Sequence, residues 1–80
     1  MTNIEKYNKA FVESFNITEA ELKGLKYQDI TAWDSVGHME LMIQLEEEFD
    51  VELDIDDITE FSSYEEGKDI LTKYEVNLEL

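Results

Sequence analysis

The sequence predicts an all-α fold: a small four-helix bundle in which a long loop joins the first two helices and the third helix is short. Three observations support this prediction. Apolar residues recur at helical spacing in several separate stretches, residues suited to helix caps precede most of these stretches, and the chain contains no proline. Because a chain of 80 residues builds only one modest core, we expect a single domain spanning residues 1–80.

The first helix is predicted over residues 3–15. Its apolar residues are separated by three, four and four positions, a spacing that places them on one helical face. They are Ile4, Tyr7, Phe11 and Phe15. Asn16 follows as a suitable stop, and the apolar face is expected to lie in the core.

The chain between this helix and Ser35 is predicted to be a long loop anchored to the helices. Thr18 and Glu21 have capping-box spacing, and Gly24 is suited to end the short turn that they begin. The loop is too apolar for a free linker, so we expect it to pack across the helices. Its apolar residues are Ile17, Leu22, Leu25, Tyr27, Ile30 and Trp33.

The central helix is predicted to begin at Ser35 and to end near Phe49. It has an apolar surface wide enough to contact several neighbours at once, formed by Val36, Met39, Leu41, Met42, Ile43, Leu45 and Phe49. Its other face carries Glu40, Gln44, Glu47 and Glu48, with Glu46 beside them. The exposed side of the central helix is therefore expected to be acidic.

A short third helix is predicted after an extended segment. The alternation of apolar and acidic residues from Val51 to Asp54 is a weak strand pattern, too short to form a sheet without a partner, so we interpret it as a loop. Asp54 or Asp56 can then cap the third helix. That helix contains Asp57, Ile58 and Phe61.

The last helix is predicted to follow Ser63, which has capping-box spacing with Glu66. Its apolar residues at helical spacing place its end near Tyr74. Since no repeat of about 20–50 residues is present, the four helices are expected to form an up-and-down bundle and not a solenoid.

Composition limits the function classes. The chain has 21 acidic residues against six lysines and no arginine, a net charge of −15, so we expect basic protein partners and no nucleic acid. It has no cysteine, which excludes disulfides and thiolate metal sites, and no metal site is expected. Charged residues interrupt the first 20 residues and no apolar run can span a bilayer, so we expect a cytoplasmic monomer without membrane insertion.

The placement of Ser35 is the most informative local feature. Asp34 and Ser35 directly precede an apolar helical repeat, which puts the Ser35 hydroxyl at a helix start, half in water. A group attached to this hydroxyl would project outward. The alternative interpretation is that Ser35 is an ordinary N-cap.

The stretch from Asp34 to Asp50 resembles the central motif of the acyl carrier proteins, the phosphopantetheine-bearing carrier domains. The residues that carry the resemblance are Asp34, Ser35, Val36, Met39, Glu40, Leu41 and Leu45 to Asp50. The order of a first helix, a long anchored loop, a short third helix and a capped fourth helix extends the resemblance over essentially the whole chain.

The resemblance implies that Ser35 accepts a 4′-phosphopantetheine arm from coenzyme A through a separate, magnesium-dependent phosphopantetheinyl transferase. The arm would hold acyl or aminoacyl groups as thioesters, and its sulfur would be the only thiol because the chain has none. Asp34 would help to present Ser35. The chain would then be a carrier without catalytic residues, visited by acyl- or aminoacyl-loading and acyl-transfer enzymes.

Two further residue sets follow from the resemblance and the helical faces. A docking surface for basic partners is expected from Val36, Glu40, Glu46, Glu47, Glu48, Asp56 and Asp57. Glu60 would extend this surface along the third helix. An acyl chain sheltered between the helices would contact Met39, Met42, Leu45 and Ile58. The simpler alternatives, a solvated acidic face and ordinary core packing, remain open.

Gly37 and His38 depart from the fatty-acid-synthesis members, which usually carry an acidic residue near the second position after the serine. His38 is interpreted as a surface residue that bears on partner recognition, and Gly37 as a point of close approach or fraying. A calcium-binding loop starting at Asp50 is excluded, because Ile55 and Phe61 occupy positions that require Gly and Glu. An unmodified acidic helical interaction module remains the alternative function.

Overall fold

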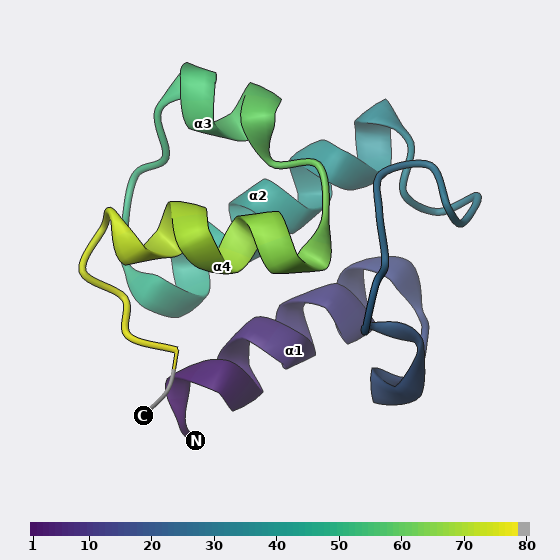
Figure 1. Cartoon of the computed structure of the whole chain (residues 1–80), viewed down its shortest axis with the longest axis horizontal. Coiled ribbons are helices and arrows are strands. Elements are labelled where there is room, and N and C mark those ends of the chain that lie inside the picture. Colours follow the sequence, from purple (N-terminus) through teal and green to yellow (C-terminus); the bar gives the residue numbers. More distant parts are fainter. Residues whose placement is uncertain (79–80) are drawn as a thin grey trace.

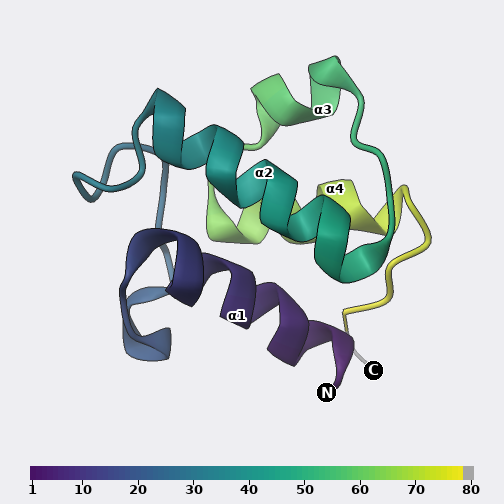
Figure 2. The same ribbon diagram turned by 180° about the vertical axis from the view of Figure 1, so that it is seen from behind.

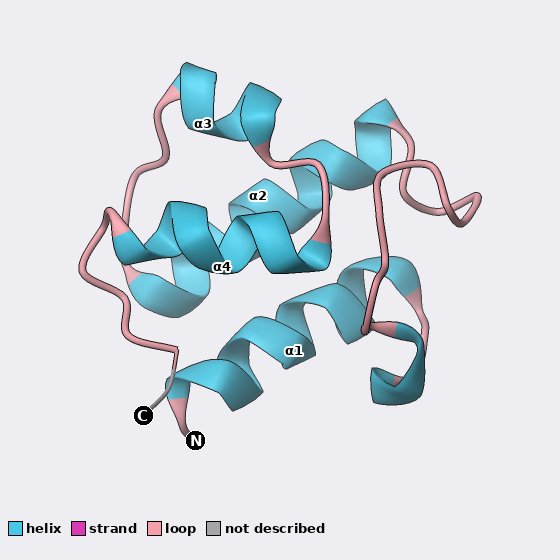
Figure 3. Cartoon of the chain, viewed as in Figure 1, coloured by secondary structure: helices cyan, strands magenta, loops and turns pink. Residues whose placement is uncertain are grey.

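The computed structural model describes residues 1–78, and its helices confirm the all-α prediction. In chain order they are α1 (Asn3–Phe15), the short 3-10 helix η1 (Glu19–Glu21), α2 (Ser35–Phe49), α3 (Ile55–Glu60) and α4 (Tyr64–Thr72). Over the described residues, loops connect these helices and no strand longer than an isolated bridge is present (Figure 3).

Successive α-helices run in alternating directions, as expected for an up-and-down bundle. In Figure 1, α1 and α3 run from left to right, whereas α2 and α4 run from right to left. The view from behind shows α1 lying alongside α2, with α3 at the far side of α2 from α1 (Figure 2). The long loop after α1 returns the chain to the start of α2.

Helix α1 begins and ends where its sequence predicts. Thr2 and Glu5 form a complete capping box, in which the Glu5 backbone N–H donates to Thr2 Oγ1 and the Thr2 N–H donates to Glu5 Oε1. Asn16 ends the helix in the left-handed conformation, with φ of 55°. The predicted apolar face is largely buried, through Tyr7, Phe11 and Phe15.

The long loop is anchored, as predicted. Leu22, Leu25 and Trp33 are buried, and Gly24 adopts a φ of +77°, which favours glycine. Two backbone hydrogen bonds tie the loop to the start of α4: the Tyr27 N–H donates to the Ser62 carbonyl, and the Tyr64 N–H donates to the Leu25 carbonyl, both at 2.9 Å. The loop is therefore a fixed part of the fold.

An aromatic cluster contributed by α1, the long loop and the α3–α4 region fills the centre of the core. The Phe11 ring lies within 5.0–6.2 Å, between ring centroids, of five other rings. These belong to Tyr7, Phe15, Trp33, Phe61 and Tyr64. Burial of these rings fixes the loop that precedes α2 and so the position of Ser35.

The second half of the chain follows the predicted order, but α3 ends at Glu60, one residue before Phe61, and the Asp54 side chain makes no capping hydrogen bond. Residues 51–54 form a loop, Asp54 precedes α3, and the Ser63 hydroxyl caps α4 by accepting the Glu66 N–H at 2.9 Å. Helix α4 ends at Thr72, two residues before the predicted end near Tyr74, and a turn follows in which Glu75 has a φ of 66°.

Candidate functional site

The cap at the start of α2 belongs to Asp34 and not to Ser35. Asp34 Oδ1 accepts the Gly37 N–H at 2.9 Å, and the Asp34 carbonyl accepts the His38 N–H at 2.8 Å. The interpretation of Ser35 as an ordinary N-cap is therefore wrong, because its neighbour makes the capping bonds. Ser35 is the first residue of α2, is exposed, and keeps its hydroxyl outside the cap.

The first turn of α2 is suited to a phosphate on Ser35. The backbone N–H groups of Ser35 and Val36 precede the first intrahelical hydrogen bond, which the His38 N–H makes. They add to the positive end of the helix dipole, which favours an anion there by about 0.3–1 kcal/mol. A phosphodiester on the Ser35 hydroxyl would meet these donors, so the residues present fit such a group.

Ser35 lies at the edge of a groove of about 380 Å³ between α2, α3 and the long loop. The groove is lined by Tyr27, Ser35, His38, Met39, Ile55, Ile58, Thr59, Phe61 and Ser62. Two larger hollows do not include Ser35: one of about 520 Å³ is lined by the end of α4 and the residues after it, and one of about 510 Å³ lies at the far end of α2, by Glu48 and Phe49. The groove is thus the hollow that a group on Ser35 would meet first.

The structure divides the four residues predicted to contact an acyl chain. Met39 and Ile58 line the groove. Met42 and Leu45 instead lie in the core, with 1% and 0% of their surfaces exposed. The resemblance grouped all four, but the three on α2 are divided, because the apolar surface of that helix is shared between the core and the groove.

His38 is not a plain surface residue, so that interpretation is wrong. It is half-buried, and both ring nitrogens have partners: Nδ1 accepts the Trp33 Nε1–H at 3.0 Å, and Nε2 lies 2.7 Å from the Ile58 carbonyl oxygen. These partners come from the long loop and from α3. Their positions depend on tertiary packing, so no local sequence signal could have found them.

The close approach expected at Gly37 is made by the long loop. A Cβ at this position would lie 1.9 Å from the Ala32 carbonyl oxygen and 3.3 Å from the Phe15 ring. Gly37 is buried, so fraying does not explain it either. Its lack of a side chain lets the loop carbonyl approach α2 directly and brings Asp34 into its capping position.

An exposed apolar strip extends from Ser35 along α2 and onto α3. Its members are Val36, Met39, Ile43 and Ile55, whose exposed fractions are 67%, 46%, 52% and 72%. Glu40 and Glu47 are exposed on the same helix, at the spacing of one or two turns that keeps residues on one side. Ile43 and Ile55 were missed as surface residues, since apolar residues at helical spacing are usually assigned to the core.

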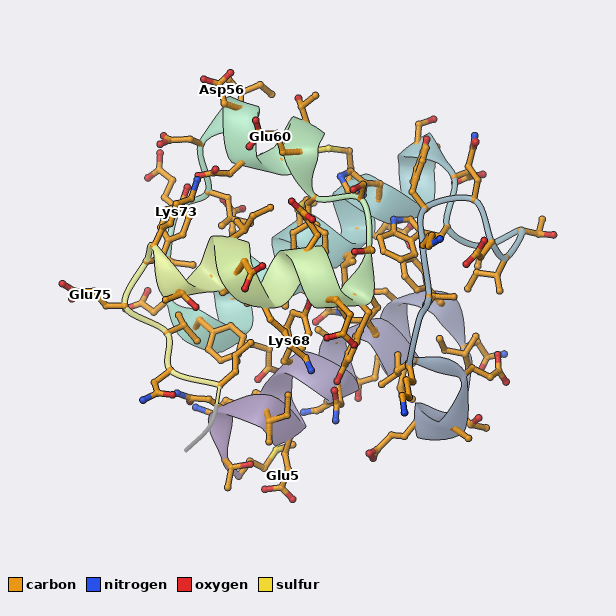
Figure 4. All side chains as sticks on the ribbon, viewed as in Figure 1. Glu5, Asp56, Glu60, Lys68, Lys73 and Glu75 are labelled. Atoms are coloured by element: carbon orange, nitrogen blue, oxygen red, sulfur yellow. The ribbon has the colours of Figure 1, made fainter. Side chains whose placement is uncertain are left out.

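Asp57 does not belong to the docking surface that the sequence predicted. It is 7% exposed, and its carboxylate accepts hydrogen bonds from Lys73 Nζ and the Tyr74 hydroxyl. The Lys73 hydrogen bond, followed by that of Tyr74, lowers the pKa of Asp57. The Asp57 carboxylate therefore makes its hydrogen bonds within the fold. Asp56 and Glu60 are exposed on α3, and Asp56 points away from the other helices (Figure 4).

Two carboxylates of α2, those of Glu46 and Glu48, likewise interact with other parts of the molecule. Glu46 Oε2 accepts the Leu53 N–H at 2.9 Å and so holds the loop that leads to α3. Glu48 faces α1, where its carboxylate lies 3.7 Å from Lys9 Nζ. The freely exposed acidic residues of the expected docking surface are therefore Glu40 and Glu47 on α2 and Asp56 and Glu60 on α3.

Comparison with known proteins adds no assignment: no family model matches the chain, and no solved structure matches it. Among residues 1–78, no helix is long and apolar enough to cross a membrane. The same residues contain no group of three or more His, Asp or Glu side chains arranged to hold a metal ion.

Proposed function

We propose that this chain is a stand-alone carrier protein. It holds acyl or aminoacyl groups as thioesters on a 4′-phosphopantetheine arm attached to Ser35 and presents them to partner enzymes. The observation that carries the proposal is the free Ser35 hydroxyl at the start of α2, released from capping by Asp34 and set at the edge of a groove. The motif from Asp34 to Asp50 supports it independently.

The division of roles between two adjacent residues supports modification of Ser35. Asp34 fixes the helix start, so adding a bulky group to Ser35 breaks no hydrogen bond of the cap. The attached phosphate would gain from the helix dipole, and the arm's sulfur would supply the thioester chemistry that the chain itself cannot. A flexible arm raises the local concentration of its cargo at a partner's active site without any catalysis by the carrier.

The exposed apolar strip supports transient docking beside Ser35. Apolar side chains with an acidic border suit a partner that has an apolar patch bordered by lysine and arginine, since unlike charges speed and orient encounter. Under this proposal the partners are a phosphopantetheinyl transferase and the acyl- or aminoacyl-loading and acyl-transfer enzymes. Glu40 and Glu47 are the residues expected to pair with them, and the cytoplasm is the expected site of action.

Intact-mass spectrometry tests the proposal directly. After incubation with coenzyme A, magnesium and a phosphopantetheinyl transferase, the chain is expected to gain the mass of one phosphopantetheine. Ser35→Ala should abolish the gain, whereas Ser62→Ala, which removes another exposed hydroxyl of the same groove, should not. If the chain gains no mass from a transferase that is active on another carrier protein, the carrier role is rejected and the unmodified interaction module takes its place.

A further inference from the structure

His38 joins three parts of the fold at the inner side of the groove. Its Nδ1 accepts the Trp33 Nε1–H of the long loop at 3.0 Å, and its Nε2 is 2.7 Å from the Ile58 carbonyl oxygen of α3. An indole nitrogen only donates and a carbonyl oxygen only accepts, so the ring carries its proton on Nε2. We call this pair of hydrogen bonds the His38 bridge.

The His38 bridge satisfies groups that have no other evident partner. Trp33 is fully buried, so its N–H needs an acceptor within the protein. The Ile58 carbonyl lies in the last turn of the six-residue helix α3, beyond the Asp57 carbonyl that accepts the Phe61 N–H. Separating α3 from α2 at this point would break the hydrogen bond between His38 Nε2 and the Ile58 carbonyl and leave both groups unpaired in a partly apolar setting.

Aromatic rings close the inner side of the groove around His38. The His38 and Trp33 ring planes are 15° apart with centroids 6.2 Å apart, an edge-to-edge arrangement that suits their hydrogen bond, and His38 meets the rings of Tyr27 and Phe61 at 5.6 and 6.0 Å. Met42 and Leu45 lie in the packed core and not along the groove. The groove therefore reaches neither of these two core residues.

We propose that the His38 bridge keeps the group carried on Ser35 in this surface groove and out of the core, which makes the protein a carrier of short acyl or aminoacyl groups. This inference rests on the proposed carrier function. A long alkyl chain could enter the core only if α3 parted from α2, and the bridge opposes that movement. Ser35 and His38 are three positions apart on α2 and line the same groove, so the bridge stands directly beside the attachment point.

The lining of the groove agrees with a short cargo. Its outer part combines the hydroxyl-bearing residues Thr59 and Ser62 with the apolar side chains of Met39 and Ile55, and all four are exposed. Such a mixed, open surface covers little of a long alkyl chain, which would remain in contact with water. A short acyl group needs no more shelter than this.

The test varies the length of the acyl chain attached at position 35 and needs no transferase. Ser35→Cys gives the protein a single thiol, which haloacetamide reagents with one pantetheine-like spacer can alkylate with a terminal acetyl or myristoyl group. Melting temperatures and NMR signals of the Met42 and Leu45 methyl groups are then compared between the two cargoes. Because this route bypasses coenzyme A, failure of Ser35 to accept phosphopantetheine and failure of the His38 inference are separate results.

With His38 present, the myristoyl form is expected to melt no higher than the acetyl form, and the core methyl signals should not depend on the cargo. In His38→Ala, the myristoyl form should melt higher by about 5 °C or more, since sheltering an alkyl chain stabilises the fold. His38→Leu replaces this variant if it does not fold. His38→Gln keeps one donor and one acceptor and should behave like the original chain.

Tyr74→Phe is the matched control, because it loosens the opposite end of α3. It removes the hydrogen bond that the Tyr74 hydroxyl accepts from the Asp54 N–H and the one that it donates to the Asp57 carboxylate. It should show no dependence on cargo length. The proposal is overturned if the myristoyl group raises the melting temperature while His38 is in place. It is also overturned if removing His38 produces no length dependence, or if Tyr74→Phe or His38→Gln produces the same dependence as His38→Ala.

Discussion

At the scale of single residues, two neighbours at the start of α2 have different roles: Asp34 caps the helix, and Ser35 keeps its hydroxyl outside the cap. An acidic residue and a serine before an apolar repeat indicate a helix start, and α2 does begin at Ser35. Either side chain can cap a helix, so the pattern could not decide that Asp34 makes the cap. The contacts of Gly37 and His38 involve residues brought close only by the fold, which local spacing does not encode.

Gly37→Ala is expected to destabilise the protein although alanine favours helices. The new Cβ would overlap the Ala32 carbonyl oxygen, and a backbone atom cannot move aside without disturbing the Asp34 cap. Overpacking of this kind costs about 1–3 kcal/mol, against a propensity gain of about 1 kcal/mol, so we expect a net loss that urea denaturation can measure. Glu47→Ala on the exposed side of α2 is the control, with a change within about 0.5 kcal/mol. Equal stability of Gly37→Ala and the original chain would refute the close approach.

At the scale of elements, helix bounds were predictable wherever periodicity and a cap agree, as they do for α1 and α2. Asn16 and Asp50 end these helices in the left-handed conformation. The sequence predicted that α3 is short and where it lies along the chain, but not where it packs, because six residues form too short a helix to be stable alone. Contacts from distant residues hold it: the His38 bridge near its end, and Lys73 and Tyr74 on Asp57 near its start.

Asp57→Asn should weaken the attachment of α3 in a pH-dependent way. Hydrogen bonds from Lys73 and then Tyr74 lower the pKa of Asp57 in the folded state, so the ionised carboxylate stabilises the fold. This contribution is fully present above the ordinary aspartate pKa of about 3.9 and is lost as pH falls through the lower folded-state pKa. The difference in unfolding free energy between the original chain and Asp57→Asn should therefore be largest at neutral pH and narrow in acid.

Asp56→Asn is the matched control for this measurement, because Asp56 is the exposed neighbour of Asp57 on α3. Asp56→Asn should change the unfolding free energy only slightly. This difference from the original chain should not become smaller in acid, whereas the difference caused by Asp57→Asn should. A gap between the original chain and Asp57→Asn that stays constant from neutral pH into acid would show that the carboxylate charge does not hold α3.

At the scale of the whole molecule, the repeated helical spacing predicted the fold class and the composition predicted the acidic surface, and both are properties of many residues together. How strongly the acidic residues destabilise the fold depends on the distances between their carboxylates, which composition does not give. All of the 21 acidic residues except Glu79 lie within residues 1–78, which extend over 30 × 26 × 19 Å and contain only six lysines to offset them. The Debye length is about 30 Å at 0.01 M salt but about 3 Å at 1 M, so at low salt nearly every carboxylate repels every other across the entire protein.

The melting temperature is therefore expected to rise with sodium chloride, by at least about 5 °C between 0.01 M and 1 M, because screening removes a repulsion present only in the compact state. The few ion pairs work in the opposite direction, but two of the three in residues 1–78, those of Lys9 and Lys68, join partly exposed side chains and contribute little. A variant that combines Glu47→Gln, Glu52→Gln and Asp69→Asn removes three exposed charges and should respond less to salt. A melting temperature indifferent to salt in the original chain would mean that its carboxylates are spaced widely enough not to oppose folding, and the acidity would then act only on partners.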